Sequence, residues 1–150
     1  MNKFLIATFA FLGAVAFASA QQGGGVPPFL EGAPPATVAA FGQLLQANGN
    51  KPDTEIDRAV EAWVAGQDAS IKTKFAAFQA KMKSANSDAE KAHASALAKF
   101  SPEAKAADAK MSAIASNPSL SGEAKGKQIE AIMGGLSPAV KAEIEKAMQG

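Results

Sequence analysis

The chain has 150 residues, and its 15 basic residues nearly balance its 14 acidic ones. This balance gives no strongly charged surface of the kind that attracts nucleic acid or an anionic membrane, so we expect no nucleic-acid partner. Cysteine is absent, which excludes a disulfide framework and a thiolate nucleophile, and the length suits one domain with an ordinary hydrophobic core.

The first twenty residues have the pattern of a secretory signal peptide. Lys3 precedes an apolar run from Phe4 to Phe17, and small residues at 18–20 form a cleavage site. The run is too short for a membrane anchor and is followed by QQGGG instead of a basic flank. We therefore expect a signal peptide at residues 1–20 that is cleaved after Ala20, a secreted extracellular protein and no transmembrane segment.

Glycine and proline dominate the next segment, residues 21–35, with the sequence QQGGGVPPFLEGAPP. This composition predicts an extended or loosely ordered N-terminal arm, in which Phe29 and Leu30 are candidate anchors onto the rest of the protein. Residues 36–150 then form a single helical domain.

Three helices are predicted in the first half of that domain, where alanine is abundant and β-branched residues are few. They cover roughly residues 35–47, residues 54–65 and a longer stretch from about Asp68. Their apolar stripes are Val38, Phe41, Leu44 and Leu45, then Ile56, Val60, Trp63 and Val64, then Ile71, Phe75, Phe78 and Met82. We expect these stripes to form the core, with Trp63 near its centre.

From residue 84 to residue 98 the apolar pattern weakens to alanines. Residues 84–98 either continue the third helix or break near Asn86, and we favour continuity. FSPEAKA from Phe100 and LSPAVKA from Leu136 share a serine N-cap followed by proline, which an internal duplication and convergent helix-start chemistry explain equally well. One further helix from about Ser121 carries Ile129, Ile132, Met133 and Leu136, and the last carries Val140, Ile144 and Met148. The predicted fold is an all-α, compact bundle of five to six helices.

The sequence contains few candidate catalytic residues. His93 is the sole histidine and lies in an alanine-rich stretch without a nucleophile elbow, so a surface histidine is expected. The spacing Glu90-x-x-His93 matches the ligand pair of di-metal bundles, but those sites need the pair twice and this chain supplies it once. We assign it no metal.

Two runs of charge are interpreted as solvated faces. Asp53, Asp57 and Glu61 recur every four residues, and the alternatives are a weak cation site or the acid/base pair of a hydrolase. The lysines at 72, 74, 81 and 83 form a rim beside the phenylalanine stripe, where an amphipathic binding surface is the alternative to core packing. We therefore predict no catalytic, cofactor-binding or metal-binding residue, no cofactor and no enzymatic activity.

Residues 117–128, NPSLSGEAKGKQ, match the spacing of a helix-loop-helix calcium loop. The ligand positions and the obligatory glycine fall on Asn117, Ser119, Ser121, Gly122 and Gln128. None of the ligand positions holds a carboxylate, and neutral dipoles do not repay the dehydration of a divalent ion. We expect a plain turn between two helices that does not bind calcium, with the relic of a metal loop as the alternative.

Several stretches together resemble the SXP/RAL family of secreted nematode proteins, which includes allergens and antigens of anisakid, ascarid and filarial worms. They are residues 28–34, Phe41 and Leu44, Thr54 and Ile56 leading to Trp63, Phe75 and Phe78, residues 101–105, and Asn117 through Ile129 and Ile132 to Leu136. The resemblance implies an all-helical fold with a possible calmodulin-like helix-loop-helix arrangement, secretion and recognition by host IgE. It implies no enzymatic activity and supplies no site residue, although the family's domain is sometimes described as cation-binding.

The leading hypothesis is a secreted, non-catalytic nematode protein that the host meets as an antigen or allergen. The alternative is a carrier of small apolar ligands such as fatty acids. In that hypothesis the face of Phe75, Phe78 and Met82 separates from the helices of Met133 and Met148 to admit a lipid.

Overall fold

The computed structural model describes residues 26–149, so the predicted signal peptide and residues 21–25 lie outside the described part. In that part the chain forms one 3-10 helix and six α-helices. They are η1 (Pro28–Leu30), α2 (Pro35–Asn48), α3 (Asp53–Ala65), α4 (Ala69–Leu97), α5 (Pro102–Ala115), α6 (Gly122–Gly134) and α7 (Pro138–Gln149). The prediction of an all-α bundle is confirmed.

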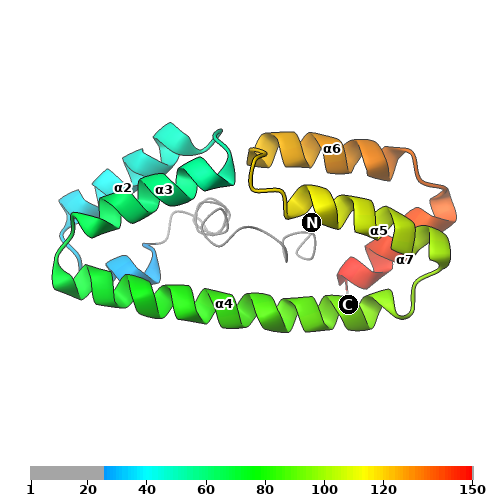
Figure 1. The fold of residues 1–150 in the computed structure, drawn as a ribbon, viewed down its shortest axis with the longest axis horizontal. Coiled ribbons are helices and arrows are strands. Elements are labelled where there is room, and N and C mark those ends of the chain that lie inside the picture. Colours follow the sequence, from blue (N-terminus) through cyan, green and yellow to red (C-terminus); the bar gives the residue numbers. More distant parts are fainter. Residues whose placement is uncertain (1–25, 150) are drawn as a thin grey trace.

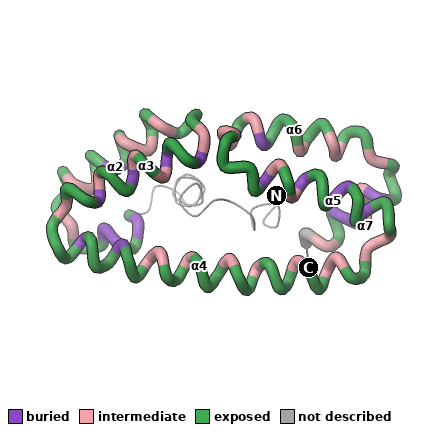
Figure 2. The backbone as a smooth tube through the Cα atoms, viewed as in Figure 1, coloured by how far each residue is buried: buried purple, intermediate pink, exposed green. Residues whose placement is uncertain are grey.

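The helices form two groups along α4 (Figure 1). The pair α2 and α3 lies beside the N-terminal end of α4, whereas α5, α6 and α7 lie toward its C-terminal end. Each group has its own cluster of buried residues, and Figure 2 shows purple, buried segments in both groups. The fold therefore contains two hydrophobic clusters that share one long helix.

The long helix α4 runs unbroken over 29 residues, which confirms the predicted continuity through Asn86. Its start is capped by Asp68, whose carboxylate accepts a hydrogen bond from the Ile71 backbone N–H at 2.9 Å. No glycine or proline interrupts residues 69–97, and alanine there favours the helix. At 1.5 Å per residue the helix is about 44 Å long, enough to connect both groups.

The helix starts in the second half follow the predicted capping chemistry. The Ser101 and Ser121 hydroxyls accept the backbone N–H groups of Ala104 and Ala124 at 3.2 and 3.3 Å. Pro102 and Pro138 occupy the first turns of α5 and α7, where the missing N–H costs nothing. The caps of Ser101 and Ser121 involve backbone groups only three residues away, so local sequence indicates these helix starts.

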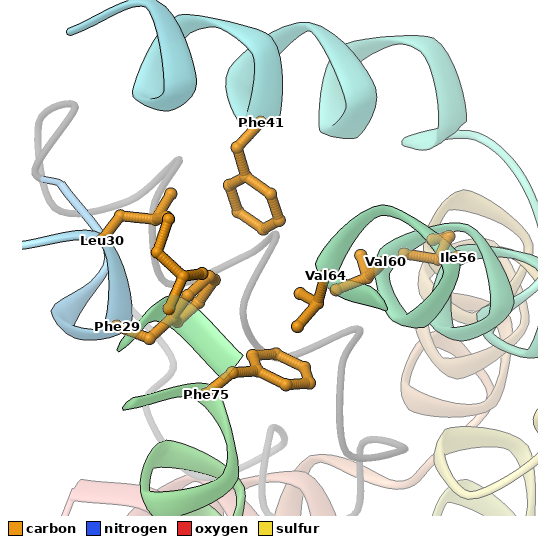
Figure 3. Close-up of a cluster of buried hydrophobic side chains, with 8 residues drawn as sticks. Phe29, Leu30, Phe41, Ile56, Val60, Val64 and Phe75 are labelled. Atoms are coloured by element: carbon orange, nitrogen blue, oxygen red, sulfur yellow. The ribbon is translucent and has the colours of Figure 1, made fainter. Parts of the chain in front are cut away.

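The first cluster combines phenylalanine rings with aliphatic side chains and includes residues of η1 (Figure 3). Its buried residues are Phe29, Leu30, Phe41, Ile56, Val60, Val64, Ile71 and Phe75. The Phe29 ring lies 5.2 Å from the ring of Phe41 and 5.0 Å from that of Phe75, in edge-to-face geometry. Docking of Phe29 and Leu30 is therefore confirmed, and Gly32, at a φ of 80°, turns the chain from η1 toward α2. The division of the chain at residues 20 and 35 stays a prediction.

Trp63 does not lie at the centre of the core, so that prediction is wrong. It is half-buried at the edge of the first cluster, and its ring centroid lies 5.0 Å from that of Phe41. The buried apolar face of α3 consists of Ile56, Val60 and Val64, which are spaced by four residues. Trp63 lies beside this face. The centre is occupied by Phe29, which the segment before the first α-helix supplies.

The second cluster is built from smaller side chains. Its buried residues are Ala104, Ala107, Met111, Val140 and Ile144, and the partly buried side chains around them are Phe100, Ile129, Ile132, Met133 and Leu136. The predicted apolar faces of α6 and α7 are confirmed in these residues, while the Met148 side chain lies outside the described part. Alanines on α5 allow neighbouring helices to approach closely.

Candidate functional site

The two groups meet at the loops that precede α3 and α6. The Thr54 backbone N–H donates to the Pro118 carbonyl at 3.2 Å, and Pro52 forms a single antiparallel backbone bridge with Ser121. Figure 1 shows that these two loops lie side by side, on the side of the molecule away from α4. They form a second connection between the two groups. The position of one group relative to the other is thus fixed by α4 on one side and by this loop contact on the other.

A buried ion pair reinforces the loop contact. The Lys125 ammonium in the first turn of α6 donates to the Asp53 carboxylate at the start of α3. Lys125 is 1% exposed and Asp53 is 2% exposed, so water reaches neither charge. The helix dipole favours Asp53 at a helix N-terminus and disfavours Lys125 there. Pairing offsets part of the cost of burial, because breaking a buried ion pair is strongly destabilising.

The predicted acidic ridge on α3 therefore needs correction. Glu61 is exposed as expected, and Asp57 is half-buried, but Asp53 is buried against Lys125 instead of solvated. The pairing residue lies 72 positions away in the sequence. No local signal in either segment indicates that they meet, so Lys125 was missed by sequence reasoning.

The segment 117–128 is a turn followed by a helix start, as predicted. The Asn117 side-chain oxygen accepts the Ser119 backbone N–H at 3.0 Å, and Ser121 caps α6. At two of the four calcium-ligand positions, Asn117 and Ser121, the side-chain oxygen thus accepts a backbone hydrogen bond. Gln128 lies in the middle of α6 and is exposed to solvent.

The one carboxylate of that segment also has a partner. Glu123 accepts a hydrogen bond from the Lys127 ammonium at 2.6 Å, one turn along α6. This hydrogen bond and the charge of Lys127 lower the pKa of Glu123, and Glu123 in turn raises the pKa of Lys127. Both side chains are well exposed, so the pair adds little to stability.

His93 is half-buried, and the expectation of a plain surface histidine missed its contact with α5. Its Nε2 lies 3.0 Å from the Asp108 carboxylate, and the Ser112 hydroxyl donates to the same carboxylate oxygen at 3.4 Å. In a catalytic triad the histidine lies between the serine and the acid, so that it takes the serine's proton. Here the acid lies between the other two, and His93 has no hydrogen bond through which to activate Ser112.

The predicted lysine rim on α4 is confirmed as exposed at residues 72, 74, 81 and 83. Lys74 also donates to the Glu31 carbonyl at 2.8 Å and so ties α4 to the turn after η1. Phe75 and Phe78 pack in or against the first cluster, which confirms core packing as their use. Met82 is half-buried and belongs to neither cluster.

Two hollows flank the C-terminal half of α4. One lies between α4 and α5, has a volume of about 550 Å³, and is bordered by Glu90, His93, Leu97 and Asp108. The other lies between the end of α4 and α7 and has a volume of about 650 Å³. Sequence reasoning did not predict them, although the alanine-rich segment 84–98 was a signal, since methyl groups leave space between helices.

A family model described as the SXP/RAL-2 family protein Ani s 5-like, metal-binding domain matches residues 1–149. The chain belongs to the SXP/RAL-2 family. The OV-17 antigen of Onchocerca volvulus is 46% identical to it over 123 residues, which are 82% of this chain and 75% of the relative. The SXP/RAL-2 family protein Ani s 5 of Anisakis simplex is 44% identical over 122 residues, 81% of this chain and 80% of the relative. No solved structure matches the chain.

The family's description names a metal-binding domain, so the side-chain groups of this chain that could coordinate a metal ion are relevant. Among residues 26–149 no three or more histidine or acidic side chains are grouped so as to hold a metal ion. In the calcium-like segment the ligand positions are neutral, and Glu123 is bound to Lys127. Asp53, the nearby buried carboxylate, already has the Lys125 ammonium as its cation. These residues do not fit a divalent cation.

Failure of this loop to bind calcium stays a prediction, which calorimetric titration checks. We expect no dissociation constant tighter than about 0.1 mM, because Ca²⁺ affinity depends on ligand charge. A tighter constant that disappears in Asn117→Ala would contradict the geometry.

Within residues 26–149 no helix combines the length and the apolar character needed to cross a bilayer.

Proposed function

We propose that this SXP/RAL-2 chain is a secreted, non-catalytic nematode protein that the host's antibodies, IgE included, recognise as an antigen. The observation that carries the proposal is its 46% identity to the OV-17 antigen across 82% of the chain. The signal-peptide pattern at residues 1–20 supports secretion, which brings the protein to the host.

The arrangement of polar side chains supports a role without catalysis. His93 is bound to Asp108, and the buried Asp53 is bound to Lys125. Groups that act as general acids or bases need access to a substrate, and Asp53 has none at 2% exposure. The exposed helical faces would then serve as antibody-binding surface.

Antibody binding to the purified mature chain tests the proposal. We expect IgE from nematode-infected hosts to bind the folded protein, and sera from uninfected hosts to give no signal. Soluble folded protein should compete for that IgE. Equal binding by infected and uninfected sera would remove the proposal, as would detection of the chain only inside worm cells with residues 1–20 still attached.

A second candidate function, carriage of small apolar ligands, is favoured by the hollows beside α4. Their location differs from the predicted one. Phe75 and Phe78 contribute to the first cluster and Met133 packs against the second, so these side chains already have apolar neighbours. The space lies instead along the alanine-rich half of α4. The volumes of both hollows, about 550 and 650 Å³, fall within the range of roughly 300–1,000 Å³ that is typical of small-molecule sites.

A further inference from the structure

The hollow between the end of α4 and α7 combines an apolar floor with a cationic mouth. Ala92 and Ala96 come from α4, Phe100 from the connection to α5, and Ala147 from α7. Three of these four side chains are single methyl groups, which leave the volume of about 650 Å³ between the helices. An apolar chain placed there would remove its methylene groups from water.

Two lysines border this hollow and are exposed. Lys99 follows α4, and Lys146 lies in the last turn of α7. Within the described residues neither lysine forms an ion pair with another side chain. Their ammonium groups are therefore available to an anion from outside the protein.

The acidic residue at the same hollow is engaged elsewhere. Glu143 accepts the Ser101 backbone N–H at 2.7 Å and the Ser101 hydroxyl at 2.8 Å, one on each carboxylate oxygen. This pair of hydrogen bonds fixes α7 against the start of α5. The side-chain hydroxyl of Ser95, also at this hollow, donates to the Lys91 carbonyl at 3.0 Å.

Charge separates this hollow from its neighbour between α4 and α5. The neighbour is bordered by two carboxylates, Glu90 and Asp108, against one lysine, Lys105. The α4/α7 hollow has two lysines against one carboxylate. An anionic head group is therefore favoured at the α4/α7 hollow and opposed at the α4/α5 hollow, because unlike charges attract and like charges repel.

We propose that the α4/α7 hollow binds a single-chain amphiphile with a carboxylate head, of the fatty-acid class. The alkyl chain lies on Ala92, Ala96 and Phe100, and the carboxylate lies between Lys99 and Lys146. The inference rests on the second candidate function, carriage of small apolar ligands, and names its site and ligand class. It is independent of antibody recognition.

Titration of the mature chain with octanoate, decanoate and dodecanoate tests the inference by NMR. We expect saturable one-to-one binding that shifts the Phe100 ring and the Ala96 and Ala147 methyl signals. Affinity should rise about fourfold per added CH₂, the change that corresponds to about 0.8 kcal/mol. Trp63 fluorescence is not the readout, because Trp63 packs against the first cluster and is not among the residues that line this hollow.

Two sets of variants locate the site. Lys99→Gln/Lys146→Gln should weaken decanoate binding roughly tenfold and leave the neutral 1-decanol unaffected, since only the charged head is lost. Lys105→Gln, at the neighbouring hollow, is the matched control and should change neither ligand. Ala96→Phe should fill the hollow and abolish binding of both ligands, whereas Ala85→Phe, on an exposed part of α4, should not. If circular dichroism shows that Ala96→Phe is unfolded, Ala147→Leu takes its place.

The outcomes separate the inference from the candidate function. The inference is overturned if Ala96→Phe still binds decanoate, or if the double lysine variant loses affinity for decanoate and 1-decanol equally. In either case the chain could still carry an apolar ligand at another site, so the second candidate function stands. Absence of saturable binding by all three carboxylates up to about 1 mM, where even a Kd near that limit would be visible, overturns both.

Discussion

The two hydrophobic clusters differ in the size and type of their side chains. The first holds Phe29, Phe41 and Phe75 in a contiguous set of rings, while the second relies on alanines and aliphatic side chains. The shared helix α4 reflects the same contrast: its first half contributes Ile71 and Phe75 to a core, and its second half is attached to α5 by the polar contact of His93 with Asp108. Large rings fill space, whereas the alanine-rich half leaves two hollows. The comparison places stability mainly in the first group and room for a ligand in the second.

The largest effect is expected at the centre of the first cluster. Phe29→Ala should lower the free energy of unfolding by about 3–5 kcal/mol, because it removes a ring that contacts three other phenylalanine rings. Chemical denaturation measures the loss. Trp63→Ala, at the cluster's edge, is the matched control and should cost about half as much. Equal losses would place Trp63 at the centre after all.

The contact between the groups comes next. Asp53→Asn should cost about 3 kcal/mol, because it takes the charge of its hydrogen-bonded carboxylate partner from the Lys125 ammonium, which stays buried at 1% exposure. Glu61→Gln on the same helix is exposed and should leave stability nearly unchanged. Replacing both partners, as Asp53→Leu/Lys125→Met, should recover most of the loss. A harmless Asp53→Asn would show that the pair does not hold the groups together.

In the second cluster the expected loss is smaller. Met111→Ala should cost about 2 kcal/mol. Removal of the flexible Met111 side chain leaves a cavity in the second cluster, which neighbouring side chains partly fill. Hydrogen exchange should show faster opening of α5, α6 and α7 than of α2 and α3. Met82→Ala, outside both clusters, is the control. Uniform loss of protection over all helices would show that the two clusters unfold as one unit.

The smallest effect is expected at the helix caps. Ser101→Ala removes the cap of α5 and the hydroxyl's hydrogen bond to Glu143, and leaves the Ser101 backbone N–H bonded to that carboxylate. It should cost about 1–2 kcal/mol. Ser137→Ala removes only a weak contact with the Val140 N–H at 3.4 Å and should cost about 0.5 kcal/mol. Thermal unfolding compares them. Identical losses would mean that Glu143 adds nothing to the cap.

Much of the helical structure was predictable because its causes are local. Ser101 and Ser121 cap helices through backbone groups three residues away, and Pro102 is compatible with a first turn. The periodic stripe of Ile71, Phe75 and Phe78 indicated a buried face that the structure confirms. The family could also be identified from the order of such stretches, and the match over residues 1–149 confirms it.

The candidate sites were less predictable because they depend on packing between distant segments. The spacing of Asp53, Asp57 and Glu61 describes one face of α3 but not what covers it. The structure places Lys125, from 72 residues away, against Asp53. His93 likewise acquires Asp108 only when α5 folds back along α4.

The sequence by itself determined where most of the helices begin, the absence of cysteine chemistry and the neutral donors of the calcium-like segment. All of these depend on residue identity or on interactions within a few positions along the chain. The tertiary structure alone decided that Phe29 is the core's centre, that Asp53 and Lys125 are buried together, and that space remains beside α4. Each of these depends on which helix faces meet and how closely side chains of unequal size allow them to approach.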